Sequence, residues 1–450
     1  MEAAEVLNGL REAAKQFQEH LASILVQDLQ FNRSQLQPTV FYHPERQLRL
    51  VVHVDDPLCS GPREEILQLY NQLGDKLAIR VGAPFNAQTD SVYLGARYRR
   101  VGDVIIEHPA EGYMEGILDI VGMKECNRLT TPGIKESIKE DQEDPALDAA
   151  RHHTYRSVVG KLQFIAPIRP DIHFALKELG RRLHQPTEAS WRAMRRLVRY
   201  VAGTRNYGLF LTTGSKDLTT LRGVTDTDWA GCQTTRKSTS AGAVFWGDFL
   251  LMSYARTQSV ISQSSPEAEL YGCVSVAAEL LYLQGLMHDM GIEVNLRIDT
   301  DASSAKAMAS RRGVGKVRHI MVKYLWLQAL VNEKRISIRK IPGSQNVTDC
   351  GTKYVDVNTL MRCAWEYGLR DVNTGKLSEI KPDKQDNTNN QEENASSGTV
   401  DHLTTVTNTA GRLIALLAAL LQPAAAVAAG TVSVTAPSPR DRRKEASKNH

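Results

Sequence analysis

Four short acidic segments in the second half of the chain constrain its fold more than any other feature. Each stands where a strand or a turn is expected to meet a helix. Two divalent cations about 3.5 to 4 Å apart need several converging carboxylates, and such a pair catalyses in-line displacement at phosphorus. A fold that gathers these segments would therefore build a two-metal nuclease site. The segments are Thr225–Asp228, Glu267–Glu269, Thr300–Ser303 and Thr348–Asp349.

Three of the acidic residues also have a simpler interpretation as helix-terminal residues. Asp301 could cap a helix expected over residues 302–310, and Asp349 could cap a helix beginning near Cys350. A side-chain oxygen at an N-cap accepts a hydrogen bond from a free backbone N–H. Glu267 stands in the first turn of a long helix, where a negative charge meets the helix dipole favourably. Taken singly, each of these acids is explained without a metal.

Glu269 is harder to explain in this way, because it shares a helical stripe with three apolar residues and is expected to face the core. A buried carboxylate is costly unless it is paired or binds a metal. Asp226 ends a strand, and Asp228 projects to the same side of that strand, so either could be the ligand there. The stripe consists of Glu269, Cys273, Val276 and Leu280.

Composition places the chain among ordinary globular proteins. Its 450 residues are 42% hydrophobic, and the length suggests two or three domains. The N-terminus shows no apolar signal-peptide core, and the six cysteines form no CxxC pair, which argues for a reducing compartment and against structural zinc. We therefore expect an intracellular protein, in the cytoplasm with the nucleus as the alternative. The cysteines stand at positions 59, 126, 232, 273, 350 and 363.

A basic stretch precedes the acidic segments. Residues 151–212 carry twelve Lys and Arg against three Asp and Glu, an excess that suits a polyanion. We expect two helices here, separated at residues 185–187. Apolar side chains line one face of the second helix, and arginines line the others, either to contact phosphates or as a solvated basic face. The arginines are Arg192, Arg195, Arg196 and Arg199.

The first hundred residues predict the back half of a small α/β domain. A helix is expected over residues 6–27 and a hairpin around residues 43–46. The second hairpin strand, residues 48–54, is apolar and delivers Asp55 and Asp56 into a turn. A helix then opens at residues 61–62, and two more strands follow. These strands are expected over residues 77–80 and 91–97.

Residues 219–354 predict a mixed sheet with helices. The helix expected over 266–290 begins with an N-cap signal, Ser264-Ser265-Pro266-Glu267, with proline in its first turn. Strands alternate with helices in a pattern typical of α/β or α+β folds. The strands are expected over residues 221–226, 241–245, 250–253, 294–298 and 336–341.

Beyond residue 376 the periodicity ends. Residues 384–397 are rich in Asn, Gln, Glu and Ser and are expected to be disordered. Residues 413–429 form an apolar run, but a spanning helix needs roughly 20 apolar residues. We expect a short helix there rather than a membrane span, and a membrane anchor is the alternative.

The order of these motifs resembles copia-type LTR retrotransposon Pol polyproteins over about residues 7–355. The second half resembles their ribonuclease H domain, and the segments before it resemble their connecting region and reverse transcriptase palm. The ribonuclease H motifs are Asp226–Gly231, Arg236–Ser240, Ser264–Glu269 and Asn346–Asp349. The earlier motifs are Leu7–Arg11, His53–Asp56, Tyr155–Leu162, Arg169–Ile172 and Arg199–Thr204.

The resemblance implies a set of site residues. The family's metal-binding carboxylates fall on Asp226, Glu269, Asp301 and Asp349. They imply two ions, and an all-oxygen ligand set favours Mg²⁺ or Mn²⁺. The implied substrate is an RNA:DNA hybrid whose RNA strand is cleaved, and the implied partners are nucleic acid and other parts of a Pol polyprotein.

The polymerase half departs from the family pattern. Asp55 and Asp56 match the paired aspartates, with His53 where the family has tyrosine and Pro57 where it has an apolar residue. The family's other catalytic aspartate belongs on an earlier strand, before the position of Leu7. Nucleotidyl transfer needs that aspartate and the pair together, so we expect no DNA synthesis from this chain alone.

We therefore expect four regions: a partial palm over 1–105, a basic helical connection over 106–218, a ribonuclease H-like domain over 219–355 and a C-terminal helix with a disordered tail over 356–450. The expected function is two-metal cleavage of RNA in a hybrid. The alternative is a non-catalytic nucleic-acid-binding remnant of a decayed element.

Overall fold

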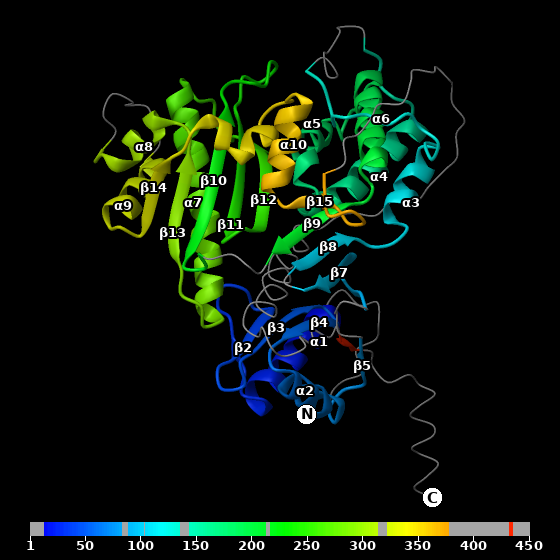
Figure 1. Ribbon diagram of the computed structural model, residues 1–450, viewed down its shortest axis with the longest axis vertical. Coiled ribbons are helices and arrows are strands. Elements are labelled where there is room, and N and C mark those ends of the chain that lie inside the picture. The colour runs from blue at the N-terminus through cyan, green and yellow to red at the C-terminus, as the bar shows by residue number, and fades with distance from the viewer. Residues whose placement is uncertain are drawn as a thin grey trace, which may run out of the picture. The chain divides into compact units, whose positions relative to one another are not determined.

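The computed structural model describes residues 13–82, 89–102, 104–135, 144–212, 217–313 and 322–377, and the backbone of 432–434 (Figure 1). The chain forms two compact units. The first comprises residues 1–106, 285–293 and 403–450, and the second comprises 107–284 and 294–402. The expectations for residues 384–397 and 413–429 lie outside the described part of the chain.

The first unit contains a four-stranded antiparallel sheet with helices against it. The strands are β1 (Asn32–Arg33), β2 (Val40–His43), β3 (Leu48–His53) and β4 (Asp56–Ser60), adjacent in that order. They pack on α1 (Ala13–Ser23), a π-helical turn (Ile24–Asp28) and α2 (Arg63–Gly74), around a core that includes Phe31, Leu50 and Leu69. The expected hairpin and second helix are therefore present, as is the described part of the first helix, whose residues 6–12 lie outside the described part of the chain.

β4 corrects the sequence prediction, which placed a turn between β3 and α2. The strand was not predicted because it contains Pro57. Proline cannot donate a ladder hydrogen bond, and within sheets it is confined mainly to edge strands. β4 is an edge strand of the sheet order β1-β2-β3-β4, so the proline is tolerated there. Further strands in this unit are β5 (Ile79–Val81), paired with β16 (Val432–Val434), and the hairpin of β6 (Ser91–Tyr93) with β7 (Ala96–Val101).

The second unit begins in β8 (Val104–Pro109) and continues through a helical region. Its helices are α3 (Tyr113–Ile120), α4 (Ala149–Ile165), α5 (His173–Gly180) and α6 (Glu188–Gly203). The basic stretch therefore holds three helices where two were expected. Pro167 and Pro170 end α4 in two short 3₁₀ turns, because proline cannot donate the hydrogen bonds of a helix interior.

A buried ion pair organises this helical region. Arg169 is fully buried, and its Nε and Nη2 donate to the two Asp171 carboxylate oxygens at 2.9 and 2.7 Å. Its Nη1 donates to the Thr204 carbonyl at 3.1 Å, and the Tyr200 hydroxyl donates to Asp171 at 2.7 Å. Buried charges are tolerated when they are paired and hydrogen-bonded. One of the twelve cations is thus internal and adds nothing to the surface charge.

The rest of the second unit is built on a mixed five-stranded sheet in the order β12-β11-β10-β13-β14 (Figure 1). β10 pairs antiparallel with β11 and parallel with β13, and β14 is parallel to β13. This confirms the five strands expected from the sequence and the mixed α/β fold of a ribonuclease H-like sheet. The strands are β10 (Thr220–Asp228), β11 (Thr239–Trp246), β12 (Phe249–Thr257), β13 (Asn295–Thr300) and β14 (Ile336–Lys340).

The helices of this part are α7 (Ser265–Asp289), α8 (Ser303–Ser310), α9 (Trp326–Asn332) and α10 (Val357–Glu366). α7 is long and apolar enough to cross a membrane by length and composition, but more than half of that window is buried inside the protein, as in the core helices of soluble proteins. The helix expected to begin near Cys350 is a short 3₁₀ turn (Val347–Gly351), and α10 begins only after it. β9 (Tyr207–Thr212) pairs antiparallel with β15 (Leu369–Asp371) and has β8 as its other neighbour.

Candidate metal centre in the second unit

Parallel pairing brings two of the acidic residues together. In the register of β10 and β13, Thr225 lies opposite Thr300. Asp226 and Asp301 are the next residues along the two segments, so both lie at the same end of the β10–β13 pairing, and Asp226 still pairs with Ala241 of β11. β10 is the central strand of the sheet, which fixes the position of Asp226 from both sides.

Glu269 joins them from the second turn of α7 because that helix approaches β10 closely. Gly272 makes the approach feasible, since a Cβ there would lie 2.7 Å from the Thr227 methyl group and 2.9 Å from the Thr225 hydroxyl. Gly223 has the same role lower on the strand, where a Cβ would lie 2.8 Å from Val276. A larger residue at either glycine would push the helix away from the strand.

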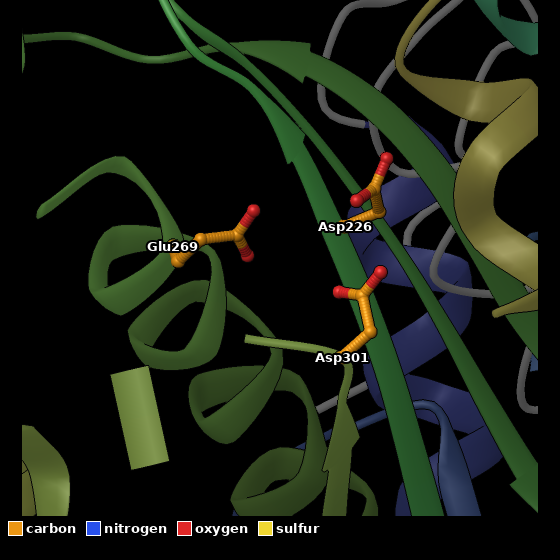
Figure 2. Close-up of side chains that lie close together, drawn as sticks. All are labelled: Asp226, Glu269 and Asp301. Atoms are coloured by element: carbon orange, nitrogen blue, oxygen red, sulfur yellow. The ribbon is translucent and has the colours of Figure 1, made fainter. Parts of the chain in front are cut away.

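The three carboxylates form a compact cluster. One oxygen from each of Asp226, Glu269 and Asp301 lies within 4.8 Å of the others. Figure 2 shows the three side chains turned toward one another from β10, from α7 and from the chain after β13. Asp226 is 5% exposed and Glu269 is 7% exposed. No other group of three or more potential ligands comes together among the described residues.

The electrostatics of the cluster are unfavourable without a cation. Burial raises the pKa of Glu269 to about 8, and the charge of Asp226 adds to the rise. Burial also raises the pKa of Asp226 to about 6, while the Thr352 hydroxyl and the Lys353 ammonium oppose this shift. Like charges held this close cannot all ionise without a compensating cation. A bound cation would therefore stabilise the ionised carboxylates of this site.

One oxygen of the cluster is buried without a well-formed hydrogen bond. This atom is Glu269 Oε2, and Thr227 lies near enough to Glu269 to oppose the rise of its pKa. An unsatisfied buried carboxylate oxygen is costly. Carboxylate oxygens are the ligands that Mg²⁺ and Mn²⁺ prefer. The residues present therefore fit a hard divalent cation.

Asp349 lies outside this cluster of three. Its carboxylate pairs with Arg362 Nη2 at 3.2 Å and with Lys353 Nζ at 3.6 Å. It is close enough to Asp226 for its charge to raise the pKa of that residue. Asn346 holds the turn in place, because its Nδ2 donates 3.1 Å to the Thr225 carbonyl and its Oδ1 accepts from the Thr348 backbone at 3.1 Å.

Two residues of the site were not singled out from the sequence. The Thr352 hydroxyl donates to Asp226 Oδ2 at 2.5 Å and also lies 3.1 Å from the Asp349 carbonyl. Burial lowers the pKa of Lys353, but the Asp226 and Asp349 carboxylates outweigh it and leave that pKa above its ordinary value. Both residues follow Asp349 within four positions. No periodic or charge pattern marked them, since their role depends on the contact between this turn and β10.

The structure also separates the alternatives that the sequence left open. Asp226, and not Asp228, belongs to the cluster. Asp301 is not a cap, because α8 has Ala302 at its N-cap position and no side-chain cap. Asp349 lies inside its 3₁₀ turn, which Asn346 caps. Glu267 is buried and hydrogen-bonded to Tyr271 and to the Gln263 backbone, so its role is local.

The second acidic pair, Asp55 and Asp56, lies at a hairpin turn in the first unit. His53 pairs with Asp56 in the register of β3 and β4, so Val54 and Asp55 form a two-residue turn. Val54 has a φ of 54°, which is rare for a β-branched residue. Burial raises the pKa of Asp56, and the charge of Asp55 adds to the rise. Among the described residues no third ligand joins them.

The arginines of α6 divide into two kinds. Arg196 Nη2 donates to Thr131 at 3.0 Å, and Arg199 Nε donates to the Asn127 carbonyl at 2.6 Å, so both hold the segment before α4. Arg192 is exposed and Arg195 is half-buried. The opposite face, with Met194, Leu197, Val198 and Val201, is buried as expected. Contact of these arginines with phosphate stays a prediction.

A mixed sheet with a carboxylate cluster at the end of its central strand defines a protein of the ribonuclease H-like class. No family model matches the chain. It is 31% identical over 242 residues to an uncharacterized mitochondrial protein of Arabidopsis thaliana, covering 93% of that protein and 52% of this chain. It is 27% identical over 331 residues to the retrovirus-related Pol polyprotein from transposon RE1 of the same plant. It is 24% identical over 388 residues to that from transposon TNT 1-94 of Nicotiana tabacum.

The chain belongs to the copia-type LTR retrotransposon Pol family. The RE1 match covers 72% of this chain and the TNT 1-94 match covers 81%. These matches cover 22% and 28% of the two polyproteins, so the chain spans less than a third of their length.

Proposed function

We propose that the second unit is a metal-dependent ribonuclease H that cleaves the RNA strand of an RNA:DNA hybrid. The carboxylate cluster of Asp226, Glu269 and Asp301 is the observation that carries the proposal, because converging acids that repel one another, two of them buried, are costly without a cation. The Pol family of the chain supports a nucleic-acid substrate and a polyprotein context. The cluster would hold Mg²⁺ or Mn²⁺, with Asp349 nearby to complete the site for two ions.

The bound ions would supply an activated water and stabilisation of the leaving oxygen in an in-line displacement. The protein residues act by positioning. Thr352 holds one Asp226 oxygen at 2.5 Å and leaves the other free for a ligand. Arg362 and Lys353 pair with the Asp349 carboxylate and balance its charge near Asp226. Gly272 holds Glu269 against the strand.

The decisive experiment is cleavage of a labelled RNA:DNA hybrid by the full chain with Mg²⁺. We expect RNA cleavage that requires the hybrid and stops when the cation is chelated. Single-stranded RNA and duplex DNA serve as substrate controls, because an enzyme that needs the 2′-OH and the hybrid shape should leave both intact. A chain that binds the hybrid and never cleaves it would instead be the non-catalytic nucleic-acid-binding protein that was the alternative from the sequence.

A further inference from the structure

An exposed aromatic residue stands at the edge of the carboxylate cluster. Trp229 follows Asp226 by three residues at the end of β10, and its side chain is 46% exposed. Its indole N–H donates to the Ser262 carbonyl at 2.9 Å. Ile261, the residue before Ser262, is 57% exposed. This hydrogen bond thus joins the two segments that carry these large exposed apolar side chains.

The surrounding structure fixes the tryptophan in place. Ala230 has a φ of 53°, a conformation that L-residues rarely adopt, and its backbone N–H donates to the buried Ser238 hydroxyl at 3.1 Å. On the other side, the Ser262 hydroxyl donates to Gln258 Oε1 at 2.8 Å. An exposed aromatic side chain that is already ordered loses little entropy on binding. The Trp229 ring is therefore preorganised for contact with a ligand.

The chemistry of the pair restricts what that ligand can offer. The only polar atom of the indole is used internally, and isoleucine has none, so the surface can make only carbon contacts. In a nucleic-acid duplex the bases are stacked inside, and the shallow minor groove of an A-like helix exposes the sugars. Sugar rings are the part of a hybrid that presents carbon atoms at this surface.

Positive charge flanks the same place. Lys177 Nζ donates to the Thr239 hydroxyl at 2.8 Å, and Thr239 lies opposite Asp228, the neighbour of Trp229, in the register of β10 and β11. Arg236 is exposed on the loop that follows Trp229. An apolar strip bordered by cations is complementary to a strand whose sugars alternate with phosphates.

We propose that Trp229 and Ile261 form an apolar platform against which the minor-groove sugars of a nucleic-acid strand pack as it crosses the carboxylate cluster. The platform deepens the proposed function and rests on its nucleic-acid substrate. It contributes affinity without base preference, because every nucleotide presents the same sugar.

The test measures binding separately from cleavage. Fluorescence anisotropy of a labelled RNA:DNA hybrid with the full chain in EDTA gives Kd without turnover. Loss of an aromatic contact to a stacked base weakens binding by about 5- to 100-fold, and we expect the lower end of that range for Trp229→Ala, because it removes a contact to a sugar. Trp229→Phe should recover most of the affinity. Trp365→Ala is the matched control, because Trp365 is 49% exposed but lies under Arg370 at 3.1 Å from its ring centroid.

The outcomes separate the two proposals. Unchanged Kd in Trp229→Ala, or a wild-type chain that does not bind the hybrid, overturns the platform. Weakened binding in Trp229→Ala with no cleavage by the wild type in Mg²⁺ supports the platform and refutes the nuclease. Ile261→Ser provides a second variant if Trp229→Ala does not fold, since Ile261 is largely exposed, and unchanged Kd there overturns the platform as well.

Discussion

The two acidic sites of this chain differ in how their carboxylates are brought together. Asp55 and Asp56 are neighbours in sequence at the tip of one hairpin. Asp226, Glu269 and Asp301 come from two strands and a helix, separated by up to 75 positions, and meet within 4.8 Å. Adjacent acids cost the fold little, because Asp55 is exposed. The converging acids repel one another, and Asp226 and Glu269 are buried, which a fold sustains only when something compensates.

The comparison shows why a pair of acids in a motif is weaker support for a metal site than buried acids on separate elements. The hairpin pair can separate its charges into solvent. The cluster cannot, because Gly272 fixes the helix and the β10–β13 register fixes the two aspartates. Experiments that treat the two sites in parallel therefore test whether burial and convergence, rather than acidity, predict metal-dependent function.

The largest difference between the two acidic sites is expected in the rate of hybrid cleavage. Asp226→Asn should reduce hybrid cleavage by well over the ~10- to 100-fold that loss of an outer-shell partner costs a metal site, because it removes a ligand itself. Asp55→Asn should leave the rate unchanged. Both rates come from one gel-based cleavage assay in Mg²⁺. Retained activity in Asp226→Asn, or loss of activity in Asp55→Asn, would reverse the comparison.

The next difference concerns stability and pH in the absence of divalent cations. A carboxyl whose pKa is raised on folding favours the folded state at low pH and loses that contribution as pH rises to its folded pKa. For Glu269 the pKa rises from 4.5 to about 8, so stability should fall across that window, by on the order of a few kcal/mol. Glu269→Gln should flatten the profile.

Urea unfolding in EDTA at a series of pH values measures this effect. Asp56→Asn is the matched hairpin variant and should change the pH dependence less, because Asp56 is only partly buried. A wild-type profile that rises between pH 5 and pH 8 would contradict the environment assigned to Glu269.

A smaller effect on the cleavage rate is expected for Thr352, which positions a metal ligand and is not a ligand itself. Thr352→Val keeps the side-chain shape and removes the hydroxyl that donates to Asp226. We expect a loss of about 10- to 100-fold in cleavage, as for other second-shell partners of metal ligands. Thr352→Ser should restore most of the rate. A purely structural role would lower the melting temperature in both variants without separating their rates at saturating Mg²⁺.

The sequence predicted the strands of the mixed five-stranded sheet well, because their apolar runs and turns are local signals, but it did not predict β8, β9 and β15. It also placed Asp226, Glu269 and Asp301 among four candidates. The residues alone left Asp226 and Asp228 open, and the family resemblance selected Asp226, which the structure places in the cluster. Thr352 and Lys353 were not predicted as site residues, since their contact with Asp226 joins positions more than a hundred residues apart. The strand after Asp55 was missed because Pro57 reads as a turn residue.

The smallest effect, and the one that could most directly overturn the comparison, is stabilisation by the metal itself. A ligand that binds only the folded state at ten times its Kd stabilises it by about 1.4 kcal/mol, which raises Tm by a few degrees in a domain of this size. We expect Mg²⁺ and Mn²⁺ to raise the Tm of the wild type and of Asp56→Asn equally. In Asp301→Asn the shift should disappear, although repulsion in the cluster is relieved and the metal-free Tm does not fall. If the shift vanishes instead in Asp56→Asn, the hairpin holds the cation, and burial is then the wrong guide to where this chain binds metal.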